Sequence, residues 1–311
     1  MSSPSLSILV PTLDAGRYLD RLLPALAAQV YDGSFEFRAL DSTSSDDTVP
    51  RLESAGWTVT SIPRAEFRHG PARNRLAAGA TGEVLVFLSQ DAVPEGPDFL
   101  TNLVAPFQDP QVGGVSARVL PHLDDDPMTA RTVLAAPEAG AESAIRELPP
   151  GQSLEQLDDR ERAEWLRFNN VASALRASVH ARVPFPDVPF GEDFAWAADA
   201  LRAGWKVGFV AEAVARHAHR YSASQAFERY RVDAAFHRRV HGLRVRPSLL
   251  SVLKGIAFEL REDWRFARSE RTGLGHLWRA PCLRTGQVMG QWFGSRGWNL
   301  PFGRSATRRW T

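Results

Sequence analysis

Acidic and imidazole side chains stand at four places along the chain where together they could do chemistry. They are Asp41, Asp91, the pair Glu192 and Asp193, and the pair His217 and His219. Carboxylate oxygens and imidazole nitrogens that meet in one crevice can hold a divalent cation, and such a cation neutralises a substrate phosphate. A carboxylate that is left free of metal can act as a general base. The residue types therefore indicate a site for a phosphorylated substrate.

The elements that must position these groups alternate between strand and helix over the first 90 residues. Short runs predict strands over Ser7–Val10, Phe35–Leu40, Trp57–Ile62 and Val84–Leu88. Leucines at helical spacing lie between the first two strands, and Arg73–Ala80 is predicted as another helix. This alternation favours βαβ units and a parallel sheet. Ligands of such sheets lie beyond the carboxyl ends of the strands, which is where Asp41 and Asp91 stand.

The remaining elements are less regular. We expect strands over Val112–Val119, Asn169–Arg176, Val207–Val210 and Val214–Arg216, and helices over Phe194–Ala203, Ser222–Val240 and residues 248–270. The acidic, polar residues 121–165 are predicted as a long loop or loose helices. A helical stripe of core type lies in Ser248–Phe266, and it consists of Leu249, Leu250, Leu253, Ile256, Ala257 and Leu260. The fold class is therefore α/β, a mostly parallel sheet flanked by helices with a helical C-terminal extension.

Composition excludes several classes of protein. The chain has 311 residues, of which 44 % are apolar and 23 % charged, so it can bury a core and is not broadly disordered. The single cysteine, Cys282, excludes an intramolecular disulfide framework and a cysteine-based zinc site. There is no run of 18 apolar residues, and Met1–Leu6 lacks the features of a signal peptide. A cytoplasmic protein is therefore expected.

Charge is concentrated near the C-terminus. The whole chain has a net charge of +1, whereas residues 245–311 carry twelve basic and four acidic side chains, a net +8. Five of the nine tryptophans fall there: Trp264, Trp278, Trp292, Trp298 and Trp310. This basic, tryptophan-rich segment favours an anionic partner, and the preferred interpretation is a packed helix followed by a surface-seeking segment at a membrane. An acceptor-binding or dimerisation lobe, or disorder over about the last 15 residues, are the alternatives. Nucleic acid is not expected, because no recognised nucleic-acid motif is present.

Six short motifs in order make the chain resemble the family 2 glycosyltransferases, whose fold is called GT-A, over about residues 5–240. The motifs are Ser7–Thr12, Asp41–Thr48, Phe67–Asn74, Phe87–Pro94, Phe190–Asp193 and Arg216–Ser222. Phe67–Asn74, Arg216–Ser222 and the triplet Gln90–Ala92 are similar to the rhamnosyltransferase branch of the family. The resemblance implies transfer of a sugar, in this branch rhamnose, from a nucleoside-diphosphate sugar to a glycan or lipid-linked glycan during polysaccharide biosynthesis.

The resemblance also implies roles for single residues. Asp41 would bind the base or ribose of the nucleotide, and the residues implied beside it are Thr12, Asp14, Arg73, Asn74 and Gln90. Asp91 matches the last acid of the family's metal motif for Mg²⁺ or Mn²⁺, and it would also lie at the nucleotide sugar. Ser89 stands where the family has the first acid, so one carboxylate is lost. His217 or His219 would supply a further ligand, and Arg64, Arg68 or Arg73 would partly replace the cation.

Asp193 matches the family's catalytic base. It would remove the proton of an acceptor hydroxyl that attacks the anomeric carbon, so that the configuration inverts, and Glu192 would orient that hydroxyl. The implied organisation is a nucleotide-sugar half over residues 1–118, an acceptor half over 119–221 and a basic helical extension over 222–311. A homodimer and a peripheral position on the inner face of the membrane are expected for that extension.

Plainer interpretations stand beside these. Asp41–Asp46 can be a capped helix start, Asp91 a turn residue, Asp193 a helix N-cap and His69 a structural histidine. Two other function classes are also compatible with the chain. One is a nucleotidyltransferase, although Pro11–Gly16 is poor in the glycine that such a phosphate loop needs. The other is a non-catalytic module that binds membranes or anionic polymers through the basic segment.

Overall fold

The computed structural model describes residues 3–270 and 274–297, so Trp298 and Trp310 lie outside the described residues. The chain divides into two compact units. The first comprises residues 1–120 and 136–217, and the second comprises residues 121–135 and 218–311. The division at residues 118 and 221 expected above stays a prediction.

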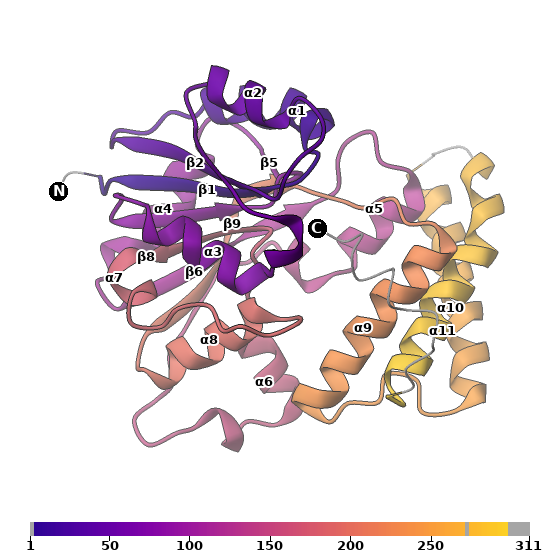
Figure 1. Ribbon diagram of the computed structural model, residues 1–311. Coiled ribbons are helices and arrows are strands. Elements are labelled where there is room, and N and C mark those ends of the chain that lie inside the picture. The colour runs from indigo at the N-terminus through magenta and orange to yellow at the C-terminus, as the bar shows by residue number, and fades with distance from the viewer. Residues whose placement is uncertain (1–2, 271–273, 298–311) are drawn as a thin grey trace. The chain divides into compact units, whose positions relative to one another are not determined.

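The first unit is built on one mixed sheet in the order β3-β2-β1-β4-β8-β6-β9-β5, with β7 paired to β9 (Figure 1). Its strands are β1 Leu6–Thr12, β2 Phe35–Asp41, β3 Thr58–Ser61, β4 Val84–Leu88, β5 Val93–Pro94, β6 Val112–Leu120, β7 Ala144–Arg146, β8 Ala172–Arg176 and β9 Lys206–Arg216. Strands β1 to β4 are parallel, as the alternation of elements predicts. β8 runs antiparallel to both β4 and β6. The two short strands expected over 207–216 form the single strand β9, whose pairing with β6 shifts register after Ala117.

Helices cover both faces of this sheet. They are α1 Gly16–Ala27, α2 Thr48–Ser54, α3 His69–Ala78, α4 Phe99–Val104, α6 Asp159–Trp165, α7 Ala177–His180 and α8 Glu192–Arg202, with short 3₁₀ turns at Arg64–Glu66, Ala105–Gln108, Pro137–Ala139 and Leu154–Gln156. Successive residues of β1 point to opposite faces, so Ile8 packs with Leu22 of α1, whereas Leu9 packs with Leu76 of α3 and Trp196 of α8. α3 and α8 therefore share one face of the sheet (Figure 1).

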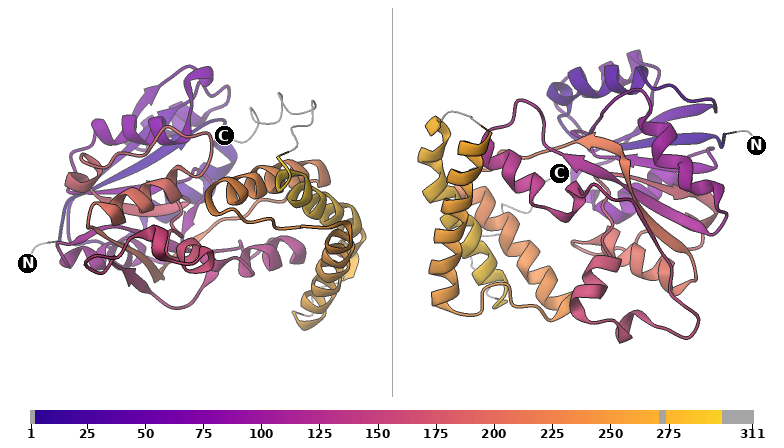
Figure 2. Two further views of the ribbon diagram at one scale, coloured as in Figure 1. Left: turned by 90° about the horizontal axis from the view of Figure 1, so that it is seen from below. Right: turned by 180° about the vertical axis from the view of Figure 1, so that it is seen from behind.

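The second unit is helical (Figure 2). It contains α5 Pro127–Leu134, α9 Ala223–His241, α10 Leu249–Ser269, the 3₁₀ turn Leu274–Arg279 and α11 Ala280–Gly294. Helix α11 corrects the expectation of a surface-seeking segment directly after α10. Gly286, Gly290 and Gly294 recur every fourth residue along α11, and a Cβ atom on each would lie only 2.3, 2.3 and 2.1 Å from backbone oxygens of α9. Only glycine permits two helix backbones to approach so closely.

The face that α10 buries is not the one its apolar stripe predicts. Leu249, Leu250 and Leu253 are 66 %, 59 % and 66 % exposed. The buried residues of α10 are Val252, Gly255, Asp263 and Ala267. The expectation of a core-facing leucine stripe was therefore wrong, because charge pairing and small residues decide which face of this helix packs.

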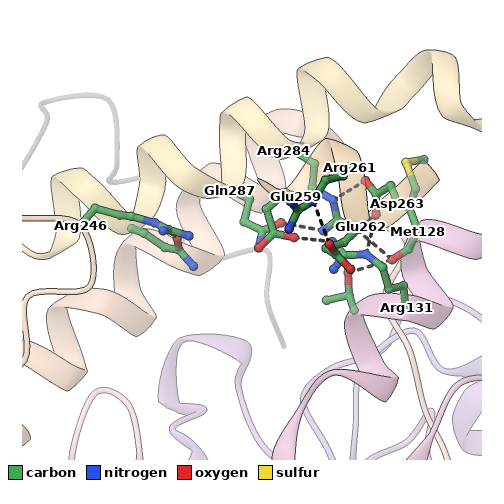
Figure 3. Close-up of polar contacts among 11 residues, drawn as sticks. Met128, Arg131, Arg246, Glu259, Arg261, Glu262, Asp263, Arg284 and Gln287 are labelled. Carbon is green, nitrogen blue, oxygen red and sulfur yellow. Dashed lines mark hydrogen bonds and ion pairs between the residues drawn. The ribbon is translucent and has the colours of Figure 1, made fainter. Parts of the chain in front are cut away.

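A buried group of charges joins three helices of the second unit (Figure 3). Arg284 of α11 donates from Nε and Nη2 to the two carboxylate oxygens of Asp263 on α10, at 2.7 Å each. Arg131 of α5 donates to the same carboxylate from Nε at 2.7 Å, and it also pairs with Glu259. Asp263 and Arg284 are 1 % and 2 % exposed. Each charge is thus compensated within the group, and the pairing ties α5 to α10 and α11.

Candidate active site

Asp41 and Thr12 lie side by side at the carboxyl ends of the neighbouring strands β2 and β1. Thr12 Oγ1 donates to Asp41 Oδ1 at 3.1 Å, and the Ser44 backbone N–H donates to Asp41 Oδ2 at 2.8 Å. Both Asp41 and Thr12 are buried. The carboxylate therefore holds the start of the loop that follows β2, at the edge of the sheet where such folds bind nucleotides.

The loop after β2 is joined to the loop after β1. Asp14 Oδ1 accepts from the Ser45 backbone N–H at 2.8 Å, and the Asp14 backbone N–H donates to Ser44 Oγ at 2.8 Å. Asp14 and Thr43 have positive φ angles of 45° and 64°. A positive φ at a β-branched threonine is strained, and such strain is characteristic of ligand-binding loops.

The loop after β4 carries Gln90 and Asp91. Gln90 bonds twice to the backbone of Leu13: the Leu13 N–H donates to Gln90 Oε1 at 2.8 Å, and Gln90 Nε2 donates to the Leu13 carbonyl at 3.1 Å. The side chain of Gln90 thereby fixes the position of the loop after β1. The loops that follow three adjacent parallel strands, β2, β1 and β4, thus form one hydrogen-bonded group that includes Thr12, Asp14, Asp41 and Gln90.

Asp91 lies beside an imidazole. His217 Nε2 is 3.4 Å from Asp91 Oδ1, and the two side chains are 15 % and 12 % exposed. His219 follows two residues later, and one ligand atom from each of Asp91, His217 and His219 lies within 4.8 Å of the others. The structure therefore brings together the three residues that the sequence analysis proposed as metal ligands. A carboxylate oxygen and two imidazole nitrogens form a donor set that suits a transition-metal dication better than Mg²⁺, which prefers oxygen ligands.

Asp193 stands in the first turn of α8, and the N-cap of that helix is Gly191, with φ 80°. Its Oδ2 accepts from the Asn170 backbone N–H at 3.3 Å, and its Oδ1 accepts from the Phe194 backbone N–H at 2.9 Å. The residue keeps part of its surface exposed. The pKa of Asp193 is raised to about 7. The larger cause is desolvation by the surrounding protein, and the second is the negative charge of Glu192. This value suits a group that must accept a proton near neutral pH.

Glu192 points away from solvent. It is 6 % exposed, and its Oε1 accepts from Arg73 Nη1 at 2.8 Å and from Asn170 Nδ2 at 3.4 Å. Arg73, which is 5 % exposed, also donates to the Asn170 carbonyl at 3.4 Å. Arg73 and Glu192 therefore compensate each other inside the protein. Asn170 was not singled out from the sequence, although the Asn169-Asn170 pair, one residue before β8, is a signal that could have found it.

Asn74 is also engaged within the protein. Its Nδ2 donates to the Phe185 carbonyl at 2.8 Å, and its Oδ1 accepts from the Phe185 backbone N–H at 3.0 Å. The same Oδ1 lies 3.0 Å from His180 Nε2. The side-chain amide of Asn74 therefore fixes the segment that leads into α8. Arg68, a sequence candidate for phosphate binding, pairs with Asp187 of this segment.

Three buried polar atoms near these loops have no hydrogen-bond partner within the part of the chain that the structure describes. They are Ser42 Oγ, Arg73 Nε and Asn169 Nδ2. Buried polar groups are nearly always satisfied in native proteins, so orphaned groups of this kind mark positions where water or a ligand bonds. Ser42 follows Asp41 directly, and Asn169 directly precedes Asn170, which contacts Asp193. Ser42 and Asn169 thus belong to the loops that carry candidate residues, whereas Arg73 belongs to helix α3.

The chain is similar in sequence to known proteins. The sequence profile described as Glycosyl transferase family 2 matches residues 7–154. The chain is 32 % identical over 240 residues to the O-antigen chain rhamnosyltransferase RfbN of Salmonella typhimurium. The alignment covers 75 % of this chain and 72 % of that protein. It is 31 % identical over 239 residues to the O-antigen chain rhamnosyltransferase WbaN of Salmonella anatum, with the same two coverages.

Solved structures show a similar fold. The mannosyltransferase PcManGT from Pyrobaculum calidifontis, in complex with GDP-Man and Mn²⁺, matches with a TM-score of 0.58 at 20 % identity, over 94 % of this chain and 86 % of that one. Residues 1–349 of TarS from S. aureus, in complex with UDP-GlcNAc, match with a TM-score of 0.51 at 15 % identity, over 92 % and 90 %. At such identities the likeness establishes the fold alone.

Proposed function

This chain belongs to the family 2 glycosyltransferases, and from that premise we propose that it transfers rhamnose from a nucleoside-diphosphate sugar to a glycan hydroxyl with inversion at the anomeric carbon. That it is a glycosyltransferase with the GT-A fold, acting on a nucleotide sugar and a glycan acceptor, follows from the family. Rhamnose is the finer part of the proposal. Its support is the 32 % and 31 % identity to two O-antigen chain rhamnosyltransferases.

In the proposed donor site, the loops after β1, β2 and β4 hold the nucleotide. Asp41 accepts hydrogen bonds from the base or ribose, and Thr12 and Ser44 orient its carboxylate. Asp14 and Gln90 fix the loops by their bonds to Ser45 and Leu13. The orphaned Ser42 Oγ is a further group that the nucleotide would satisfy. These residues bind and orient the donor and take no part in proton transfer.

Asp193 is the proposed general base. The observation that carries the proposal is its place in the first turn of α8, where backbone N–H groups hold both carboxylate oxygens and its pKa is raised. The carboxylate takes the proton of the acceptor hydroxyl as the hydroxyl oxygen bonds to the anomeric carbon. The bond from that carbon to the diphosphate oxygen breaks on the opposite face, so the configuration inverts. Asn170 holds one carboxylate oxygen of Asp193, and Phe194 holds the other. A carboxyl with a pKa of about 7 gives a substantial ionised fraction and still binds a proton well.

Arg73, Glu192 and Asn74 are placed in this account as positioning residues. Glu192, which directly precedes Asp193, is paired with the buried Arg73, and the two charges act on the pKa of Asp193 in opposite directions. Asn74 fixes Phe185, in the segment that leads into α8. The resemblance implied direct nucleotide contacts for Arg73 and Asn74 and an acceptor contact for Glu192. The positioning roles proposed here differ from those, and they rest on the inward hydrogen bonds of the three side chains.

Asp91, His217 and His219 would hold the metal ion. We propose Mn²⁺, because imidazole ligands favour a transition-metal dication over Mg²⁺ and because the mannosyltransferase of similar fold is described with Mn²⁺. When bound, the ion supplies positive charge to the leaving diphosphate. Because Ser89 stands in place of a second carboxylate, Asp91 is the one negatively charged ligand proposed for the metal. The imidazoles of His217 and His219 are the other two proposed ligands. Arg73 is not a substitute for the ion in this account, because its charge is compensated by Glu192.

The acceptor is proposed to be a glycan or lipid-linked glycan, with the chain lying peripherally on the inner, cytoplasmic face of a membrane. The net charge of +8 over residues 245–311 supports contact with anionic lipid. None of the helices in residues 3–270 and 274–297 has the length and apolar character needed to cross a bilayer. A homodimer through the same extension stays a prediction.

Thermal stabilisation against nucleotides tests the donor site. The purified chain is heated with free nucleotides and nucleotide sugars, each with Mn²⁺, Mg²⁺ or EDTA, because a ligand that binds only the folded state must raise the melting temperature. A shift with one nucleoside-diphosphate family, larger with Mn²⁺ than with EDTA and lost in His217→Ala, is expected. A shift that is the same in EDTA contradicts the metal assignment, and no shift with any nucleotide contradicts the donor site.

A further inference from the structure

Three arginines line a cavity in the second unit that lies outside the catalytic machinery. The cavity has a volume of about 260 Å³ and is lined by Arg238, Arg244, Pro247, Ser295 and Arg296. Arg238 comes from the end of α9, Arg244 and Pro247 from the connection to α10, and Ser295 and Arg296 directly follow α11. At about 30 Å³ per water molecule, the cavity has room for a polar group of several heavy atoms.

The positive charges of this cavity are not compensated by carboxylates. In the described ranges, no ion pair links Arg238, Arg244 or Arg296 to an aspartate or glutamate. Arg296 donates only to main-chain oxygens, those of Arg246 at 3.1 Å, Trp292 at 3.4 Å and Pro247 at 3.0 Å. Its guanidinium also lies 4.2 Å from the centre of the Trp292 ring. The fold therefore holds Arg296 in place without neutralising it.

Guanidinium groups gathered around a cavity are suited to phosphate. The planar fork of arginine matches two phosphate oxygens at once, and its charge is always present. The hydroxyl of Ser295 accepts from the Val245 backbone N–H at 3.1 Å and still has its own O–H to donate, so the polar side chains of the lining can all donate to an anion. A neutral sugar would leave the three positive charges of the lining uncompensated. The chemistry of the lining therefore selects an anion with several oxygens.

Exposed apolar side chains adjoin this cavity along the chain. Leu243 and Val245, on either side of Arg244, are each 38 % exposed. Leu249 is two peptide bonds from Pro247, so their Cα atoms lie within about 7.6 Å. With Leu250 and Leu253 it forms the exposed start of α10. An apolar surface next to an anion pocket fits a ligand that carries its phosphate on a hydrocarbon chain.

The rest of α10 has the character of a helix that lies at a membrane interface. Trp264 and Phe258 are 46 % and 49 % exposed. Arg268 lies over the Trp264 ring at 5.2 Å, and Arg261 lies over the Phe258 ring at 5.6 Å. Exposed aromatic and leucine residues bordered by arginines are typical of amphipathic helices that bind anionic lipids.

We propose that the second unit binds an anionic phospholipid of a membrane, with the lipid phosphate between Arg238, Arg244 and Arg296 and the exposed leucines of α10 in the acyl layer. The proposal rests on the membrane contact in the proposed function and is independent of the transfer chemistry. It specifies a built phosphate site in addition to the general positive charge of residues 245–311.

Vesicle binding by the full chain tests the proposal. Binding is measured by co-sedimentation with vesicles of phosphatidylcholine alone and with vesicles that contain phosphatidylglycerol. Wild type is expected to prefer the anionic vesicles, and Arg238→Gln/Arg244→Gln to bind them about 30-fold more weakly, at about 1 kcal/mol per basic residue near the surface. The matched control is Arg160→Gln/Arg182→Gln, which removes two exposed arginines of the first unit and is expected to bind as wild type.

Soluble pyrophosphate and a leucine variant separate a lipid headgroup from a free anion. In EDTA, which keeps metal out of the proposed donor site, pyrophosphate is expected to raise the melting temperature of wild type and of Leu249→Ser/Leu253→Ser, but not that of the arginine variant. The leucine variant is expected to lose vesicle binding. An equal loss in the arginine variant and its control overturns the proposal, because only net charge would then matter. Vesicle binding that persists in the leucine variant, or a leucine variant that instead changes a dimer into a monomer in light scattering, overturns it as well.

Transfer to a soluble acceptor by the wild-type chain is measured separately. Transfer without lipid binding leaves the proposed function standing and overturns the lipid site. Lipid binding without transfer leaves the lipid site standing and overturns the proposed function.

Discussion

Arg73 and Glu192 form a buried ion pair in which Arg73 Nη1 lies 2.8 Å from Glu192 Oε1, and Glu192 directly precedes Asp193 in the chain. The two charges of this pair act on the pKa of Asp193 in opposite directions. The charge of Glu192 raises the pKa of Asp193, the charge of Arg73 lowers it, and desolvation makes the largest contribution in the upward direction. A carboxyl that would ordinarily be ionised at pH 5 is thereby held near its titration point at neutral pH.

The pH dependence of the transfer rate follows from this pKa. Asp193 must be ionised to accept the acceptor proton, and its pKa is about 7. We expect kcat/KM to rise about tenfold per pH unit below pH 7 and to level off above it. The measurement is a pH–rate profile between pH 5 and 9 at saturating Mn²⁺. A profile that is flat from pH 5 to 8 would show that no group of this pKa controls the reaction.

Replacing Arg73 tests the positioning role. Arg73→Met leaves the buried Glu192 without a counter-ion, so the free energy of unfolding should fall by about 3–5 kcal/mol. Because the charge of Arg73 lowers the pKa of Asp193, the acid limb of the pH–rate profile should move to higher pH. Urea unfolding and the pH profile measure the two effects.

Two further variants serve as controls for Arg73. Arg73→Met/Glu192→Leu removes both charges and should recover most of the lost stability. Arg75→Met changes an exposed arginine of the same helix and should alter the free energy of unfolding by less than about 0.5 kcal/mol. An acid limb that stays in place in Arg73→Met, in a variant that is still folded, would reduce the pair to a structural role.

Asp41 tests the donor site. Asp41→Asn keeps the shape of the side chain but removes the charge that orders Thr12 and Ser44. Loss of a charged hydrogen bond to the nucleotide should weaken donor binding about 10- to 100-fold, with little change in the pH profile. Calorimetric titration with the nucleoside diphosphate measures the effect, with the exposed Asp20→Asn as control. An unchanged affinity would remove Asp41 from the nucleotide site.

The glycines of α11 test the packing of the second unit. Gly290→Ala places a Cβ atom 2.3 Å from the Phe227 carbonyl oxygen, so the two helices must separate. We expect a loss of about 1–3 kcal/mol in the free energy of unfolding, although alanine is the better helix former. Gly275→Ala, which meets nothing within 4 Å, is the control. Equal stability of the two variants would contradict close packing of α11 on α9.

The sequence predicted the parallel part of the fold well, because its local signals are strong there. Val84–Leu88 has no polar residue and forms β4 over the predicted range, in the interior of the sheet. The antiparallel position of β8 between β4 and β6 depends on pairing between strands about 60 to 90 residues apart, and no local pattern specifies it.

Two features of the C-terminal region could not be predicted from hydrophobic pattern alone. The apolar stripe of α10 is the strongest local signal there, yet the buried ion pair of Asp263 with Arg284 determines the packed face. A glycine-rich segment ordinarily predicts loop, whereas Gly286, Gly290 and Gly294 at spacing four form a helix contact. Glycine at spacing four is a sequence signal for close helix packing, and a pattern of apolar residues does not contain it.

At the candidate site, it was easier to predict which residues come together than which way their side chains point. Asp91 and His217 follow different strands, and their meeting at 3.4 Å fits the expectation that strand ends converge at one edge of a sheet. Arg73 and Glu192 were expected to face substrate. Their inward orientation results from each being the other's counter-ion at a distance of 119 residues along the chain, and a sequence does not reveal that pairing.

The transfer reaction of wild type and Asp193→Asn tests the central claim most directly. Both are incubated with a nucleoside-diphosphate rhamnose, Mn²⁺ and a glycan acceptor, and the product is analysed by mass spectrometry and for anomeric configuration by NMR. Folding of the variant is checked at pH 8. Because the pKa of Asp193 is raised in the folded state, its ionisation destabilises the protein progressively as the pH rises to about 7, so the asparagine variant should be at least as stable. We expect wild type to give a rhamnosylated product of inverted configuration, and the variant to be slower by about 10²–10⁴-fold with donor binding retained. A folded variant that transfers at the wild-type rate, or a product with retained configuration, would contradict the account.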